Sequence, residues 1–107
     1  MEQGAYRYIL EMQTPLGTRR GELRLSVCGS SLTGELTMFT RTTPILEGKC
    51  NGQHISFCGE MKNLLKDIPY QSEGKISGSK LSLVFATESC HYPATGFLAS
   101  NISEKEE

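Results

Sequence analysis

The chain has no tryptophan, no long apolar run and no excess of charge of either sign. No stretch approaches the roughly 20 consecutive apolar residues of a membrane-spanning helix. The net charge of −1 gives no sign of binding to nucleic acid or to an anionic membrane. The first residues also lack the basic and then apolar segments of a signal peptide. We therefore expect a cytoplasmic protein that binds neither nucleic acid nor membrane.

The sequence also lacks every motif that would name a chemistry. It has no glycine-rich phosphate loop, no zinc-ligand spacing and no visible set of nucleophile, base and acid. Cys90 and His91 are adjacent, but the other histidine, His54, is expected at the opposite end of the fold. The sequence therefore favours a function that is not enzymatic, with no catalytic residue, metal or cofactor.

Cysteine usage agrees with a location inside the cell. Without an export signal, the four cysteines are expected to be free thiols, whereas an exported domain would be able to form two disulfides. The residues concerned are Cys28, Cys50, Cys58 and Cys90.

What the chain does contain is alternation. Eight strand-like runs can be recognised, and the first places Tyr6, Tyr8, Leu10 and Met12 on one face. Seven connections join the runs. The even-numbered ones are tight and glycine-centred, at 28–31, 51–53 and 78–80, and the odd-numbered ones are longer, at 14–20, 40–43, 62–67 and 88–93. In an up-and-down meander, the two kinds of connection fall at opposite ends.

This pattern predicts one all-β domain over residues 1–107, with its core at about 5–100 and a charged tail at 101–107. The expected architecture is an antiparallel meander of about eight strands closed into a small barrel, with a β-sandwich as the alternative. Five runs share a central glycine on the inward register, which suits a sheet that coils tightly around a crowded interior. These glycines are Gly34, Gly48, Gly59, Gly74 and Gly96.

The order of the segments TPLG, LTGEL, PILEGKCNGQHISF and GKISGSKLSL resembles a family of small, mostly uncharacterised bacterial β-barrel domains. These domains are lipocalin-like, or calycin-like, and the resemblance covers about residues 6–98. It implies the barrel fold and supplies no catalytic residues. The chain lacks the Gly-x-Trp that true lipocalins carry near the first strand, so the resemblance implies no lipocalin function.

The longer connections collect most of the unusual side chains. Barrel mouths are common ligand sites, so two leucines are candidates for an apolar lid and the arginines for binding a carboxylate or phosphate head group. The alternative is that the arginines are solvated and the leucines cap the core. The candidate ligand-binding residues are Arg19, Arg20, Arg41, Leu64, Leu65, Asp67, His91 and Tyr92.

The outward faces of the last two strands carry apolar residues where polar ones are usual. Antiparallel pairing is expected to bring them together, with a residue of the first strand beside them, and such a patch suggests a symmetric homodimer. In a β-sandwich some of these residues would be core instead. The candidate interface residues are Ile9, Val84, Ala86, Phe97 and Ala99.

Two functional hypotheses follow. The first is a non-enzymatic binding module for a small apolar or amphipathic molecule at the end of the long connections. The second is a structural or interaction domain that acts as a homodimer through its outer apolar face.

Overall fold

The computed structural model describes residues 3–62 and 66–101. It has nine antiparallel strands: β1 (Gly4–Thr14), β2 (Gly17–Cys28), β3 (Ser31–Met38), β4 (Arg41–Pro44), β5 (Leu46–Asn51), β6 (His54–Lys62), β7 (Asp67–Ser77), β8 (Lys80–Ala86) and β9 (His91–Asn101). No helix occurs in the described part of the chain, and so none there is long and apolar enough to cross a membrane.

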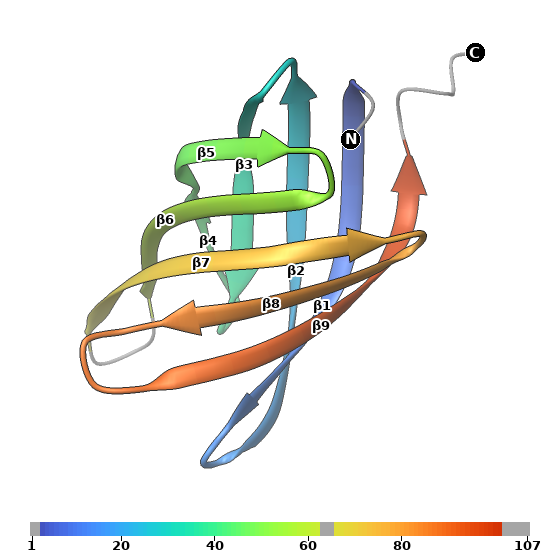
Figure 1. Cartoon of the computed structure of the whole chain (residues 1–107). Coiled ribbons are helices and arrows are strands. Elements are labelled where there is room, and N and C mark those ends of the chain that lie inside the picture. Colours follow the sequence, from blue (N-terminus) through green and yellow to red (C-terminus); the bar gives the residue numbers. More distant parts are fainter. Residues whose placement is uncertain (1–2, 63–65, 102–107) are drawn as a thin grey trace.

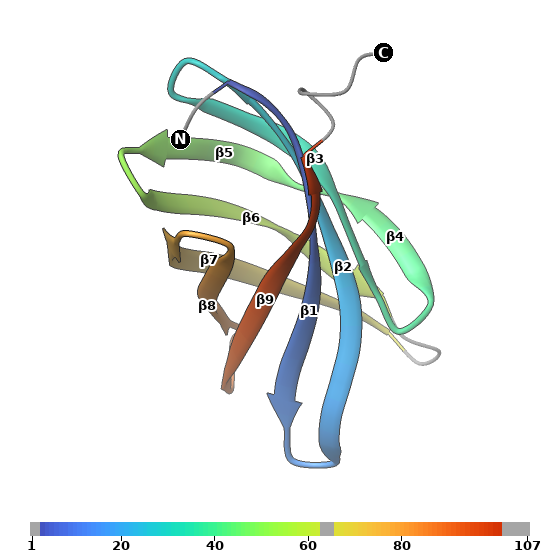
Figure 2. The same cartoon turned by 90° about the vertical axis from the view of Figure 1, so that its right-hand side faces the viewer.

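Eight of the strands close into a barrel (Figures 1 and 2). The hydrogen-bonded order is β2-β1-β9-β8-β7-β6-β5-β3, and the pairing of β2 with β3 closes the ring. The ninth strand, β4, pairs with β3 alone. The predicted all-β barrel is therefore confirmed, and the alternative of an open two-sheet sandwich is wrong.

The sequence predicted a connection at 40–43 and a fourth strand over 44–50, and this prediction is wrong: residues 41–44 form β4, and β5 begins only at Leu46. Ile45 lies between β4 and β5 and donates its N–H to the carbonyl of Gly34 at 3.0 Å. Glu47 has a left-handed backbone, with φ of 53°. The pairing of β5 with β6 shifts register between Leu46 and Lys49. The bulge interrupts the ladder here, and β4 pairs with β3 alone instead of extending the ring.

The first connection is shorter than predicted. Only Pro15 and Leu16 separate β1 from β2, and the side chain of Thr14 holds the turn by accepting the N–H of Leu16 at 3.2 Å. The β1–β2 hairpin consequently projects beyond the rest of the barrel (Figure 2). Arg19 and Arg20 lie in β2 and not in a loop, which corrects their predicted placement.

The interior of the barrel is filled by the side chains that the alternation placed inward. Phe57, Tyr70 and Phe85 form a cluster of edge-on aromatic contacts, with ring centroids 5.2–6.3 Å apart. The four predicted inward residues of β1 are all buried. The described cysteines are free thiols, as expected.

The inward glycines are explained by crowding. A Cβ on Gly34, Gly48 or Gly74 would overlap a backbone carbonyl oxygen of the neighbouring strand. A Cβ on Gly96 would lie 2.8 Å from a methyl group of Leu10. The sequence prediction that these glycines serve a tightly coiled sheet is confirmed.

Candidate ligand site at the barrel rim

The connections of the chain divide between the two ends of the barrel, as the meander requires. The tight glycine turns lie at the top and right of Figure 1, whereas the β1–β2, β3–β4 and β8–β9 connections lie toward the bottom and left. We call this second end the rim; its described part consists of residues 14–17, 38–41 and 86–91 together with the strand ends that adjoin them, among them those of β6 and β7.

The rim contains a cavity of about 270 Å³. Its lining comes from β1 and β2, from the β3–β4 turn, and from the ends of β6, β7 and β9. The lining residues are Met12, Thr14, Pro15, Leu16, Arg19, Phe39, Met61, Ile68 and Tyr92.

The cavity has an apolar floor and apolar walls. Met12 and Met61 form the floor and are only 1% and 2% exposed. Both face inward, from β1 and β6. Phe39, Ile68 and Tyr92 are half-buried and pack against the core. Methionine adapts to irregular shapes, so this floor suits an apolar guest.

Leu16 forms the outer edge of the cavity. It lies at the tip of the projecting hairpin and is 83% exposed. Gly17 follows it with φ of 115°, a value that side-chain-bearing residues rarely adopt, and this glycine closes the turn. The turn thereby holds the Leu16 side chain at the mouth of the cavity, where it remains largely exposed to solvent.

The β3–β4 turn adds a strained aromatic residue. Phe39 and Thr40 have φ of 58° and 62°. Tight hairpin turns of this kind normally use Asn and Gly, because a Cβ is unfavourable in the left-handed region. The turn nevertheless holds the Phe39 side chain against the cavity. Strain of this kind is frequently found at functional sites.

One of the three predicted arginines reaches the cavity. Arg19 lies across from Met12 in the β1–β2 ladder, whereas Arg20 lies across from Glu11. Directly opposed residues share a face of the sheet, so Arg19 is on the inward side and Arg20 on the outward side. Arg41 is exposed in β4 and does not line the cavity.

The β8–β9 connection positions Tyr92. The Thr87 hydroxyl donates to the Cys90 carbonyl at 3.1 Å, and the Thr87 N–H donates to the same oxygen at 2.8 Å. Cys90 is half-buried, and its hydrogen bond with the Tyr92 side chain raises the pKa of that phenol. His91, between them in sequence, is exposed and lies across from Ala86.

Asp67 does not line the cavity; it is exposed and forms an ion pair with Lys62 at 3.6 Å. Leu64 and Leu65 lie outside the described residues. Of the predicted residues that the structure describes, Arg19 and Tyr92 line the cavity.

Sequence reasoning missed most of the apolar lining. Met12 and Met61 were assigned to the core, and Phe39 and Ile68 were given no role. The available signal was that inward alternation of apolar residues continues to Met12 in β1 and Met61 in β6, near the ends of these strands, which places apolar side chains at the mouth.

A larger hollow lies elsewhere. It has a volume of about 750 Å³ and extends from Pro44 and Leu46 across Gly59 to the end of β8. Tyr70 adjoins it, and the hydroxyls of Tyr70 and Ser72 are buried without a hydrogen-bond partner within the described part of the chain.

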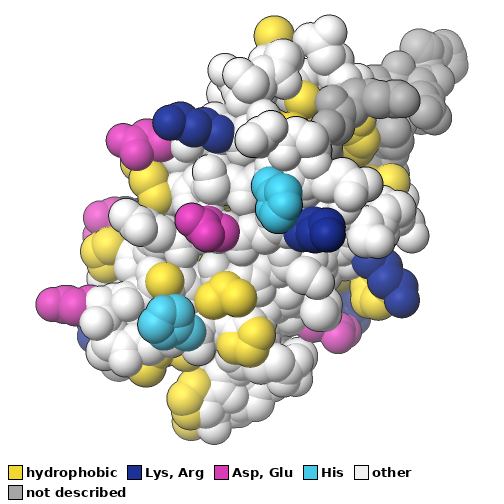
Figure 3. Space-filling model, in the orientation of Figure 1, with side chains coloured by type: hydrophobic (Ala, Val, Ile, Leu, Met, Phe, Trp, Pro, Cys, Tyr) yellow, Lys and Arg dark blue, Asp and Glu magenta, His cyan; other side chains and the backbone are white. Residues whose placement is uncertain are grey.

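The predicted apolar outer patch is divided by the register of the strands. Val84 lies across from Pro93 and Ala86 from His91, whereas Phe97 lies across from Lys80. The expectation that Val84 and Ala86 adjoin Phe97 and Ala99 is therefore wrong. On the face shown in Figure 3, apolar side chains form small separate groups among polar and charged ones.

The pairing of Ile9 with Phe97 is confirmed. The Phe97 side chain is 50% exposed, and the ammonium group of Lys80 lies 6.0 Å from the centre of its ring. These three residues form a small apolar surface with a cation beside it, and we call it the Phe97 surface.

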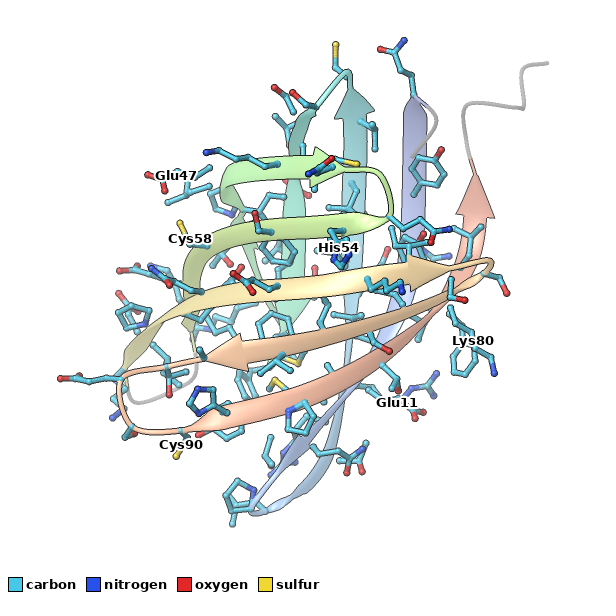
Figure 4. The ribbon with its side chains drawn as sticks, in the orientation of Figure 1. Glu11, Glu47, His54, Cys58, Lys80 and Cys90 are labelled. Carbon is cyan, nitrogen blue, oxygen red and sulfur yellow. The ribbon has the colours of Figure 1, made fainter. Side chains whose placement is uncertain are left out.

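The described residues contain no group of three or more potential metal ligands. Figure 4 shows Cys90 at the rim and His54 well away from it. A scan against protein-family models and searches of curated proteins and of solved structures found no match to this chain.

Proposed function

We propose that this barrel is a non-enzymatic binding module that holds a small, mainly apolar molecule in the rim cavity. The apolar body of the ligand lies on Met12 and Met61, and Phe39, Ile68 and Tyr92 surround it. The free thiols agree with the further proposal that the protein acts in the cytoplasm.

One observation carries the proposal. The inward faces of the strands carry a core of buried side chains, yet at the rim the same inward faces end in an unfilled apolar hollow. An apolar guest would gain about 25 cal/mol for each Å² of apolar surface removed from water. Leu16, which is otherwise exposed, would gain cover from the same guest.

The test is native mass spectrometry of the protein purified without denaturant. We expect a reproducible mass excess in the wild type that is lost in Ile68→Asp, because a carboxylate in the cavity wall opposes an apolar guest. Val84→Asp, on the outer face, is the matched control and retains the excess. If Ile68→Asp carries the same excess as wild type, the rim is not the binding site.

A second candidate function is a homodimer through the Phe97 surface. It is favoured by the half-exposed Phe97 beside Ile9, an apolar pair on the outer face of the sheet. Light scattering of Phe97→Glu tests it, with Thr33→Glu on the outer face of β3 as the control. A wild-type dimer that becomes monomeric only in Phe97→Glu supports this function, and a dimer that survives the change contradicts it.

A further inference from the structure

The rim cavity has a chemical polarity of its own. Arg19 is the only charged side chain among the described residues that line it. The other lining groups are apolar side chains and the hydroxyls of Thr14 and Tyr92. A guest in this cavity therefore meets hydrocarbon on the floor and a single cation at the mouth.

The position of Arg19 in β2 is unusual. Val27, Leu25 and Leu23 occupy the inward register of this strand and are buried, and Gly21 continues it. Arg19 is the next inward position, across from the buried Met12. The alternation of β2 predicts an apolar residue at this position. The chain has an arginine instead, and its guanidinium extends the inward face of β2 beyond the barrel.

Arg19 also has no carboxylate of its own. The ion pairs found within residues 3–62 and 66–101 include those of Arg7, Arg24 and Lys62. Arg19 takes part in none of them. The adjacent Arg20, by contrast, lies across from Glu11 on the outward face. The guanidinium at the mouth is thus available to an anion that comes with the guest.

The size of the cavity limits the guest. Liquid water occupies about 30 Å³ per molecule, so 270 Å³ holds roughly nine non-hydrogen atoms. This is a small amphiphile, and it is at the lower end of the usual size for ligand pockets. Arginine binds carboxylates and phosphates through two parallel N–H bonds, which orients the guest with its head outward.

We propose that the rim cavity selects small amphiphiles with one anionic head group, which Arg19 binds at the mouth while the apolar tail lies on Met12 and Met61. This inference rests on the proposed binding function and adds the charge of the ligand and its orientation. A carboxylate and a phosphate monoester share the required chemistry.

The experiment compares probes with the same tail and different heads. Octanoate, octyl phosphate, n-octanol and octylammonium are titrated into the wild-type protein by calorimetry at low and high salt. We expect both anions to bind about tenfold more tightly than n-octanol, and octylammonium more weakly, since a partly exposed charge pair contributes modestly. The preference declines at high salt because mobile ions screen the pair. The anion that binds more tightly identifies the source of the head group.

Matched variants separate this inference from the underlying function. Arg19→Met keeps an unbranched apolar stem and is expected to lose the preference for anions while n-octanol still binds. Arg19→Lys retains part of the preference, and Arg20→Met, on the outward face, retains all of it.

Three results would overturn the inference. Equal affinity of the wild type for octanoate and n-octanol would show that the cavity does not select an anion, although it would still support the apolar binding site. An equal loss of preference in Arg20→Met and Arg19→Met shows a general charge effect and not a head-group site. If no probe binds, the proposed function fails together with the inference.

Discussion

The hydroxyl of Tyr70 lies over Gly59, its partner in the β6–β7 ladder, such that a Cβ on Gly59 would be 3.1 Å from that oxygen. The hydroxyl is buried and has no hydrogen-bond partner within the described part of the chain. Burial raises the pKa of Tyr70, so the phenol stays protonated at any ordinary pH.

This pair leads to the first prediction, on Tyr70→Phe. Removing an unsatisfied buried hydroxyl removes its desolvation cost and leaves the ring contacts with Phe57 and Phe85 in place. The variant is expected to be as stable as wild type or more stable by about 1 kcal/mol. Urea unfolding measures this, and a loss of more than about 1 kcal/mol would show that the hydroxyl has a partner after all.

The second prediction compares two inward glycines. A Cβ on Gly74 would overlap the backbone oxygen of Ser82, which cannot move without disturbing β8, whereas a Cβ on Gly59 meets atoms at 3.1 Å. Gly74→Ala should therefore lose about 2 kcal/mol or more, and Gly59→Ala clearly less. Part of the Gly59→Ala loss should be recovered in the double variant with Tyr70→Phe. The prediction is refuted if urea unfolding ranks the two single variants in the reverse order.

The third prediction concerns the strained rim turn. Thr40 has φ of 62°, and a β-branched residue there costs about 1–2 kcal/mol relative to glycine. Thr40→Gly is expected to raise the free energy of unfolding by about 1 kcal/mol. Thr42→Gly is the control, because Thr42 lies in β4 with its hydroxyl 2.7 Å from that of Thr37, and it should destabilise. Thermal unfolding that shows both changes destabilising would contradict the strain at residue 40.

The fourth prediction concerns pH. The hydrogen bond from Arg24 lowers the pKa of Glu22 below its ordinary value of 4.5, and Arg7, at 2.6 Å, acts in the same direction against partial burial. A carboxyl whose pKa is lowered by folding stabilises the protein above its unfolded pKa, and this contribution is lost as pH falls through the folded pKa. Wild type should therefore be more stable than Glu22→Gln at neutral pH, and the two should converge only once the pH has fallen below the lowered pKa of Glu22. A gap that stays constant through the acid range would show that the charge of Glu22 is not involved.

Much of the fold was predictable because it depends on local periodicity. Tyr8, Leu10 and Leu25 show their inward register in the sequence itself, and the five inward glycines indicated a tightly coiled sheet before any pairing was known. The division of the fourth strand was not predictable, because nothing in the sequence marks Glu47 as left-handed. The extension of β2 to Gly17 was missed because the exposed residues 18–20 show no apolar alternation.

The candidate site was less predictable, for reasons of register and direction. The length of the β8–β9 connection sets the register of these strands and places Val84 opposite Pro93. Because the sequence does not reveal this register, it could not show that Val84 and Phe97 lie apart. The sequence placed both His91 and Tyr92 at the rim, but it did not show which of the two faces the cavity. In the structure Tyr92 lines the cavity and His91 is exposed. The same holds for Arg19 and Arg20. Consecutive residues of a strand face opposite sides of the sheet, so only the register of β2 shows which arginine faces inward.

The most direct test of the central claim is an amide NMR titration of the isotope-labelled protein with n-octanol, which probes the apolar cavity without any charge. The account predicts saturable shift changes that concentrate at Met12, Phe39, Ile68 and Tyr92 and are absent from the tight turns at Gly29 and Gly52. Shift changes centred on Val84 and Phe97, or no saturable change at all, would contradict a ligand site at the rim.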